Sequence, residues 1–165
     1  MDQLDLRQDS ILFGEQEYAM ALDTVIAVAQ QRLLIFDQDC SIGHFTSVKR
    51  YDLIHAFLIK NATTQLTIIL QNVNFFTLHC PRLYALLATY SHKIKIYETN
   101  NSAKAEKDCF IIADNQAYIR RFHIDQARFK YALNDAETTA SLVDRFEALL
   151  QETSRALSAT QLGLS

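Results

Sequence analysis

The two side chains best suited to acid–base chemistry are His123 and Asp125. They stand two residues apart, so they lie on the same face if this segment is extended. An imidazole beside a carboxylate is the usual arrangement of a general base. The surrounding segment, 117–131, contains no serine or cysteine that could act as the nucleophile. We therefore interpret the pair as a binding or structural feature, and a catalytic role stays an alternative.

The same segment combines basic and aromatic side chains. It carries four basic residues against one carboxylate, whereas the whole chain has a formal net charge of −3. Basic residues interleaved with rings can contact phosphates while the rings stack on nucleobases. The other interpretation, which the sequence favours, is a strand with its rings in the core and its charges in solvent. The residues concerned are Arg120, Arg121, Arg128 and Lys130 with Tyr118, Phe122, Phe129 and Tyr131.

We expect anion binding, if it occurs, to use the polar side chains of this region, and we predict no catalytic residue among them. The candidate set is Asp114, Arg120, Arg121, His123, Asp125, Arg128, Lys130 and Asn134. Zinc is disfavoured, because Cys40 and His44 span a predicted loop and His79 and Cys80 are adjacent. Cysteine is also readily buried as a small apolar residue. We expect neither a metal ion nor a cofactor.

The composition excludes several classes of nucleotide-binding enzyme. The 165 residues include three Gly and one Pro, and Gly14, Gly43 and Gly163 lie far apart. A Rossmann fingerprint, a P-loop and a nucleophile elbow all need closely spaced glycines. The length suits one domain, and three widely spaced cysteines do not form a disulfide framework. No apolar run is long enough for a membrane span, and we expect a cytoplasmic protein without a membrane partner.

Hydrophobic periodicity predicts alternating helices and strands. The predicted strands are 32–37, 65–70, 93–97, 109–113 and 117–122, and the predicted helices are 15–31, the stretch around 51–58, the residues after Pro81 and those after Asn134. We therefore expect an α/β fold with a mixed, largely parallel sheet and helices on both faces. A late hairpin would turn at Asn115, since asparagine tolerates a left-handed backbone. Residues 1–14 would form a polar leader, 15–154 a single domain and 155–165 a frayed tail.

Two carboxylates follow the first predicted strand, at the edge where parallel sheets bind their ligands. Asp37 and Asp39 flank Gln38 there. They could hold a cation or cap the following turn, and the sequence does not separate these uses.

The order of elements and several residue runs resemble one half of a phospholipase D-like (HKD) protein. The resemblance covers 15–154 and includes LLIFD, LTIIL, IKIYE and the stretch AEKDCFIIADNQAYIRRFHIDQARFKYALND. At finer grain, LLIFDQD, HCPRL, FIIAD and FHIDQAR resemble an uncharacterised proteobacterial domain with a degenerate phospholipase D fold. Half-size members of the superfamily pair around a two-fold site, so the resemblance implies a homodimer.

The family motif HxKxxxxD is not intact in this chain. The resemblance puts Lys107 at the histidine position and Cys109 at the lysine position, and only Asp114 matches. Arg121 and Phe122 stand where a glycine and a serine are expected. Phospholipase D chemistry needs an imidazole nucleophile and a lysine that stabilises the phosphoryl oxygens. The residues at these positions supply neither.

The sequence therefore predicts a phospholipase D-like pseudoenzyme that works as a binding or scaffolding module. Its partner would be a second copy or another protein. One alternative is a weak nucleic-acid or phosphodiester-binding protein that uses the basic segment. The other is a phosphodiester hydrolase with a site rebuilt around His123 and Asp125.

Overall fold

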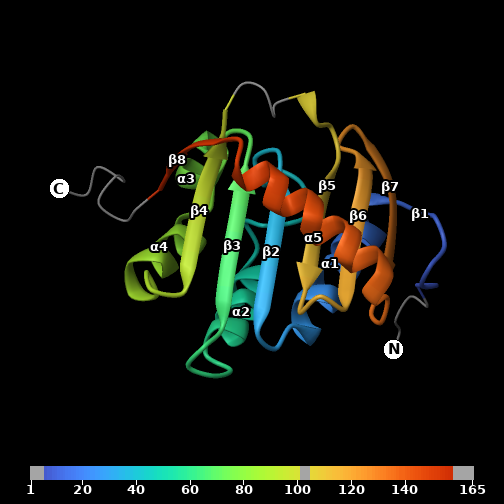
Figure 1. Ribbon diagram of the computed structural model, residues 1–165, viewed down its shortest axis with the longest axis horizontal. Coiled ribbons are helices and arrows are strands. Elements are labelled where there is room, and N and C mark those ends of the chain that lie inside the picture. The colour runs from blue at the N-terminus through green and yellow to red at the C-terminus, as the bar shows by residue number, and fades with distance from the viewer. Residues whose placement is uncertain (1–5, 101–104, 158–165) are drawn as a thin grey trace.

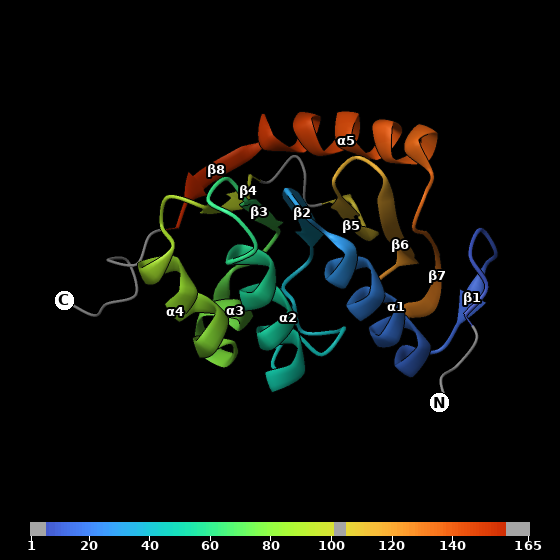
Figure 2. The same cartoon turned by 90° about the horizontal axis from the view of Figure 1, so that it is seen from below.

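The computed structural model describes residues 6–100 and 105–157, which form one eight-stranded sheet between two layers of helices. Helices α1 to α4 cover one face of the sheet, and α5 crosses the other face (Figures 1 and 2). The described strands are β1 (Leu12–Phe13), β2 (Arg32–Asp37), β3 (Gln65–Leu70), β4 (Ile94–Thr99), β5 (Cys109–Ala113), β6 (Ala117–His123), β7 (Gln126–Ala132) and β8 (Thr153–Ala156). The described helices are α1 (Glu15–Val28), α2 (Val48–Leu58), α3 (Asn74–His79), α4 (Pro81–Thr89) and α5 (Ala136–Leu150).

The expected α/β fold with helices on both faces is confirmed, but a largely parallel sheet is wrong. The strand order is β1-β7-β6-β5-β2-β3-β4-β8. Only β2–β3 and β3–β4 are parallel among the described pairs. The other five described pairs are antiparallel, so the sheet is mixed and mostly antiparallel.

The error has a physical cause in the second half of the chain. The basic segment 117–131 does not form one strand, because the chain reverses around Ile124 and Asp125 to give β6 and β7. Tight turns rather than helices join β5, β6 and β7, and a tight turn between neighbouring strands makes them antiparallel. The short edge strands β1 and β8 add two further antiparallel pairs.

The alternation of side chains along β2 divides the core between the two faces of the sheet. Leu33 and Ile35 belong to the larger core under α1 to α4. Leu34 and Phe36 belong to a second core, where Phe146 of α5 packs. All five residues are at most 4% exposed. A strand buried on both faces reads as a continuous apolar run, as the sequence of β2 does.

The turn between β5 and β6 rests on Asp114 and Asn115, as we expected for the asparagine. Their φ angles are 61° and 65°, and the Gln116 N–H donates to the Ala113 carbonyl at 3.1 Å. The β-turn over 113–116 has positive φ at both central positions, the form that matches the twist of the strands. Asparagine and aspartate do here what glycine does in most such turns.

Structured residues extend beyond the limits that the sequence predicts for the domain. The Tyr131 hydroxyl donates to the Leu6 carbonyl at 2.7 Å, and β1 pairs with β7 within the expected leader. On the other side, β8 pairs with β4, and Leu157 is 8% exposed. No described helix has the length and apolarity that a membrane crossing requires.

Candidate functional site

The motif positions that the resemblance assigns to Cys109 and Arg121 lie where the carboxyl ends of β2 and β3 meet the start of β5 and the end of β6. Cys109 opens β5 and pairs with Arg121 of β6 in the register of the sheet. Asp37 ends β2 in the neighbouring position. We call this edge of the sheet the motif edge.

Arg121 is buried at the motif edge, and its charge is already paired. Its side chain is 1% exposed and donates to both carboxylate oxygens of Glu15, at 2.7 and 2.8 Å. It also donates to the carbonyls of Ile124 at 2.8 Å and His123 at 3.3 Å, and its guanidinium lies over the Tyr18 ring. The hydrogen bond from Arg121 lowers the pKa of Glu15. A guanidinium with these partners has little capacity left for a phosphate.

Cys109 is buried beside Arg121, and its thiol is unreactive. Its sulfur lies 3.3 Å from the Tyr18 hydroxyl, and burial raises the pKa of the thiol well above its usual value. Burial also raises the pKa of the Asp37 carboxyl to about 7. A thiol attacks only as its thiolate, so this site lacks an activated sulfur nucleophile. Lys107 is exposed, and its carbonyl accepts from the Ile124 N–H at 2.8 Å.

His123 and Asp125 are close together, but their contact is unlike that of a general base. The Asp125 backbone N–H donates to His123 Nδ1 at 3.1 Å, and the Asp125 carboxylate lies 3.8 Å from the same nitrogen. A neutral imidazole that accepts at Nδ1 carries its proton on Nε2. In a catalytic triad the carboxylate instead accepts from Nδ1–H and leaves Nε2 free to take a proton. Both side chains are exposed, at 43% and 80%.

Asp114 and Asn134 lie at the opposite end of the β5–β6 hairpin, away from the motif edge. The Asp114 carboxylate accepts from the backbone N–H groups of residues 30–32, at 2.7, 2.7 and 2.9 Å. The Asn134 side chain accepts from the Gln116 amide at 2.8 Å. The structure therefore brings together Arg121, His123 and Asp125 but separates Asp114 and Asn134 from them.

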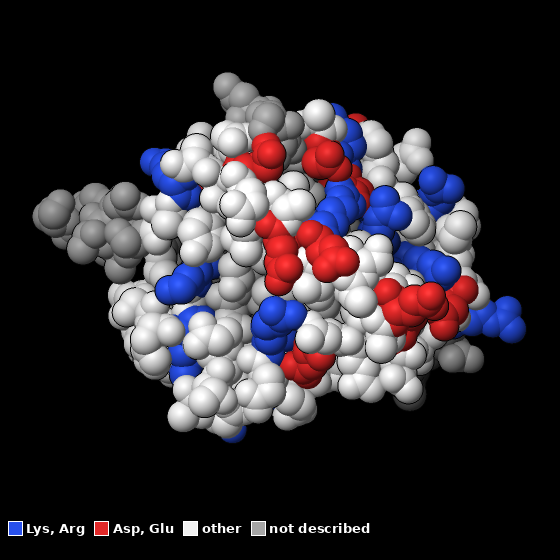
Figure 3. Space-filling view, in the orientation of Figure 1, with Lys and Arg blue, Asp and Glu red and all other residues white. Residues whose placement is uncertain are grey.

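The remaining candidates form a basic strip on the α5 side of the sheet, made of Arg120, Phe122, Arg128 and Lys130. The guanidinium groups of Arg120 and Arg128 lie 5.1 and 5.2 Å from the centre of the Phe122 ring. Arg120 lies opposite Lys130 in the register of β6 and β7. Its guanidinium forms an ion pair with the Asp108 carboxylate at 2.8 Å. Figure 3 shows basic side chains beside α5, over β6 and β7.

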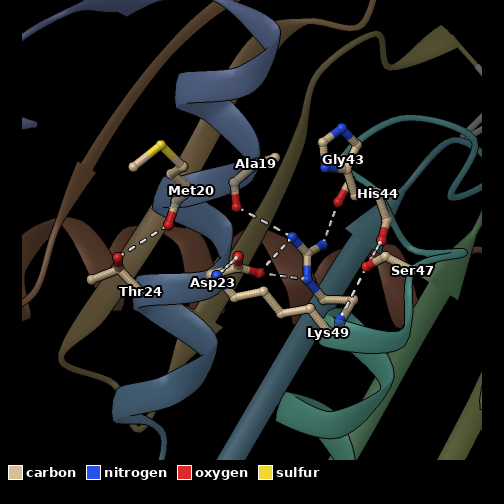
Figure 4. A network of polar contacts seen from close by, with 9 residues as sticks. Ala19, Met20, Asp23, Thr24, Gly43, His44, Ser47 and Lys49 are labelled. Atoms are coloured by element: carbon tan, nitrogen blue, oxygen red, sulfur yellow. Dashed lines mark hydrogen bonds and ion pairs between the residues drawn. The ribbon is translucent and has the colours of Figure 1, made fainter. Parts of the chain in front are cut away.

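A second buried arginine, Arg50, was not among the candidates. It is 1% exposed and donates to the Asp23 carboxylate at 3.0 and 2.9 Å and to the carbonyls of Ala19 and Gly43. These partners converge between α1 and the loop that precedes α2 (Figure 4). Periodicity carries a signal for this burial, because Arg50 stands four residues before the apolar Ile54 on one helical face.

The residues that could hold a ligand lie around a cavity of about 380 Å³ at the motif edge. Its lining includes Asp39, Gln71, Asn72 and Asp125. Asp37 is not among the lining residues, and its carboxylate accepts from the Gln38 N–H at 2.6 Å. Within 6–100 and 105–157, no three His, Cys, Asp or Glu side chains are placed to hold a metal ion.

Comparison with known proteins identifies the family. A model described as a domain of unknown function (DUF7931) matches residues 14–161. The chain belongs to this family. No curated protein matches the sequence significantly.

Solved structures show that the DUF7931 chain has a phospholipase D-like fold, as expected. Nuc from Salmonella typhimurium, described as a phospholipase D family member, superposes with a TM-score of 0.63 at 13% identity, over 90% of this chain and 98% of Nuc. NucT from Helicobacter pylori gives 0.58 at 15% identity, over 87% and 96%. TrmBL2, an archaeal chromatin protein, gives 0.64 at 14% identity, over 92% of this chain. This chain covers only 55% of TrmBL2.

Proposed function

We propose that this DUF7931 domain is a non-catalytic phospholipase D-like module that binds a partner or ligand at the motif edge. The observation that carries the proposal is the ion pair between the buried Arg121 guanidinium and the Glu15 carboxylate, at 2.7 Å. It occupies the place that the resemblance assigns to the glycine–serine segment of the active enzymes. The guanidinium is oriented toward a carboxylate of its own chain rather than toward a substrate.

The other positions of the motif support the same proposal. An active site of this type needs a nucleophilic imidazole and a fixed cation at the phosphoryl oxygens. Cys109 is buried with a raised thiol pKa, and Lys107 is exposed before the strand begins. His123 accepts a hydrogen bond at Nδ1, so the neutral imidazole carries its proton on Nε2. A general base of the triad type needs Nε2 without a proton.

A phosphodiesterase assay tests the proposal. We expect the purified chain to hydrolyse bis(p-nitrophenyl) phosphate no faster than a heat-denatured sample. Turnover by the native chain that is lost in His123→Ala and kept in Asp144→Asn would overturn the proposal. That result would establish the hydrolase with a site rebuilt around His123 and Asp125. Asp144 is a suitable control, because it is an exposed carboxylate on α5.

A second candidate function, nucleic-acid binding, is supported by the basic strip. Two guanidinium groups lie near the Phe122 ring, and rings beside cations are the usual platform for unpaired bases. The structure of TrmBL2, which shares the fold, is described as showing a novel mode of DNA binding. Against this function, Arg120 is paired with Asp108 and Arg121 with Glu15. Binding would therefore depend mainly on Arg128 and Lys130.

Fluorescence polarisation with a labelled oligothymidine decides whether the strip binds nucleic acid. Counterion release predicts that affinity falls steeply between about 50 and 200 mM salt. The double variant Arg128→Gln, Lys130→Gln should lose this binding, and Lys49→Gln on α2 should keep it. Absence of binding even at low salt removes the second candidate.

The partner of the module would be a second copy of this chain or another protein. Light scattering across micromolar concentrations separates the two. A monomer mass throughout excludes the homodimer that the resemblance implies, and a concentration-dependent dimer mass supports it.

A further inference from the structure

The cavity at the motif edge has walls that are fixed before any ligand arrives. It lies between the loop after β2, which supplies Asp39 and Ser41, and the β6–β7 turn, which supplies Ile124 and Asp125. Its volume of about 380 Å³ is within the range of small-molecule sites. Carboxyl ends of parallel strands are also where open α/β sheets bind their ligands.

Each of these two walls is held by a buried arginine. Arg50 donates to the Gly43 carbonyl and ties the loop after β2 to Asp23 of α1 (Figure 4). Arg121 donates to the carbonyls of His123 and Ile124 and ties the β6–β7 turn to Glu15 of α1. Both arginines are 1% exposed. Rigid support of this kind is what a binding site needs to hold its geometry.

The third wall, at the end of β3, is fixed by amide hydrogen bonds. The backbone N–H groups of Gln71 and Asn72 both donate to the Gln38 carbonyl, at 3.0 and 2.9 Å. The side-chain amides of Gln38 and Gln71 both donate to the Glu106 carbonyl, at 2.9 and 2.7 Å. The wall thus presents polar groups whose orientation is set by the fold.

The charges around the cavity have one sign. Asp39 and Asp125 line it, and none of the described lining residues is a lysine or arginine. Among the described residues neither carboxylate is paired with a lysine or arginine: Asp39 accepts from the Ser41 N–H at 2.9 Å, and Asp125 lies near His123. The Arg121 guanidinium, which holds the β6–β7 turn, is oriented toward Glu15. Two negative charges that line one cavity disfavour a further anion there and favour a cation.

We propose that this cavity binds a small organic molecule that carries an ammonium or guanidinium group, with its cation held between Asp39 and Asp125. The amides of Gln38, Gln71 and Asn72 and the Ser41 hydroxyl then meet the polar remainder of the ligand, and Ile42 and Ile124 cover its carbon chain. A phosphate in the same place would face two carboxylates without a compensating cation. The inference rests on the proposed function in one respect only, that the motif edge is a binding site rather than a hydrolytic one.

Titration of the full chain with agmatine and putrescine, followed by NMR chemical shifts at low salt, tests the inference. We expect saturable shifts at the motif edge with both amines and none with inorganic phosphate. Loss of one charge-assisted contact should weaken binding about tenfold in Asp39→Asn and in Asp125→Asn. The control Asp144→Asn makes the same charge change on the exposed surface of α5 and should bind as the unaltered chain does.

Each contrary result has a separate meaning. Phosphate binding at this edge, or amine binding that both cavity variants retain in full, overturns the inference. A flat titration with both amines also overturns it and leaves the proposed non-catalytic function standing. Phosphodiester turnover that depends on His123 overturns the proposed function instead, whatever the amine titration gives.

Discussion

The two ends of the β5–β6 hairpin hold their charged groups in opposite ways. At the turn end, the Asp114 carboxylate accepts from three backbone N–H groups and needs no cation. At the motif edge, Arg121 is buried against Glu15, and the Asp37 carboxyl is 3% exposed. Asp114, the residue that the resemblance matches to the family motif, holds backbone together. Cys109 and Arg121, at two positions where the resemblance expects other residues, are buried side chains.

Removal of Arg121 should have the largest effect, because it breaks the motif edge at its centre. Arg121→Met loses the pair with Glu15 and leaves the carbonyls of His123 and Ile124 without their donor, for a loss of about 3 kcal/mol of unfolding free energy. Urea unfolding measures this loss. Glu15→Gln keeps one acceptor oxygen but removes the counter-charge of a buried guanidinium, so it should cost about 2 kcal/mol. If Arg121→Met is as stable as the unaltered chain, the buried guanidinium does not hold this edge.

Removal of Asp114 tests the opposite end and should cost less. Asp114→Ala leaves the N–H groups of residues 30–32 without their acceptor and places alanine at a φ of 61°, for a loss of about 2 kcal/mol. Asp114→Asn keeps one oxygen acceptor and tolerates the left-handed backbone, so it should lose about half as much. Urea unfolding again gives the values. A loss near zero in Asp114→Ala would show that the carboxylate has no part in holding the turn.

The Asp37 carboxyl should make the stability of the chain depend on pH through the motif edge. Burial raises its pKa from 3.8 to about 7, so the folded state keeps a proton that the unfolded state loses between these values. Through this group the free energy of unfolding falls as the pH rises from about 4 to 7, by at most about 1.4 kcal/mol per pH unit. Above about pH 7 the group adds no further change.

The variant Asp37→Asn measures that dependence by difference. The stability of the variant minus that of the unaltered chain should rise with pH across this window and level off above it. The subtraction removes the opposite slope of carboxyls such as Glu15, whose pKa is lowered chiefly by its hydrogen bond with Arg121. A flat difference for Asp37→Asn would mean that water or a local opening solvates this carboxyl.

The smallest effect is expected at Arg120, the neighbour of Arg121 on the other face of β6. Arg120 is 39% exposed and shares the Asp108 carboxylate with Arg145. Burial alone would raise the pKa of Asp108, but the hydrogen bonds from Arg145 and Arg120 lower it below its usual value. Arg120→Gln removes a partly exposed guanidinium and leaves Arg145 on the buried Asp108 carboxylate, so it should cost about 0.5 kcal/mol. A loss as large as that of Arg121→Met would erase the contrast between the two faces of the strand.

The sequence was sufficient to predict the elements whose apolar periodicity is strong. Strands β2, β3 and β5 and helix α5 carry nearly continuous or clearly periodic apolar residues, and each lies where it was predicted. The direction of the strands was harder to predict, because it depends on how the chain returns to the sheet. The turn at Ile124 and Asp125 carries no glycine or proline, so nothing in the local sequence separated β6 from β7.

The candidate site was predicted only where neighbours in sequence are neighbours in space. His123 and Asp125 were found together because they share one turn. The pairing of Arg121 with Glu15 joins residues 106 positions apart, and no spacing rule reaches that far. Asp114 and Asn134 seemed close to the basic residues along the chain, but the length of the hairpin places them at its other end.

The burial of all three cysteines has a practical consequence. Cys40, Cys80 and Cys109 are buried and free, and burial raises the pKa of each thiol. Maleimides and nitroxide reagents react with exposed thiolates, so the native chain should take up such labels slowly. A single cysteine placed on the surface of α5 or α2 could then carry a fluorophore or spin label without prior removal of the native three.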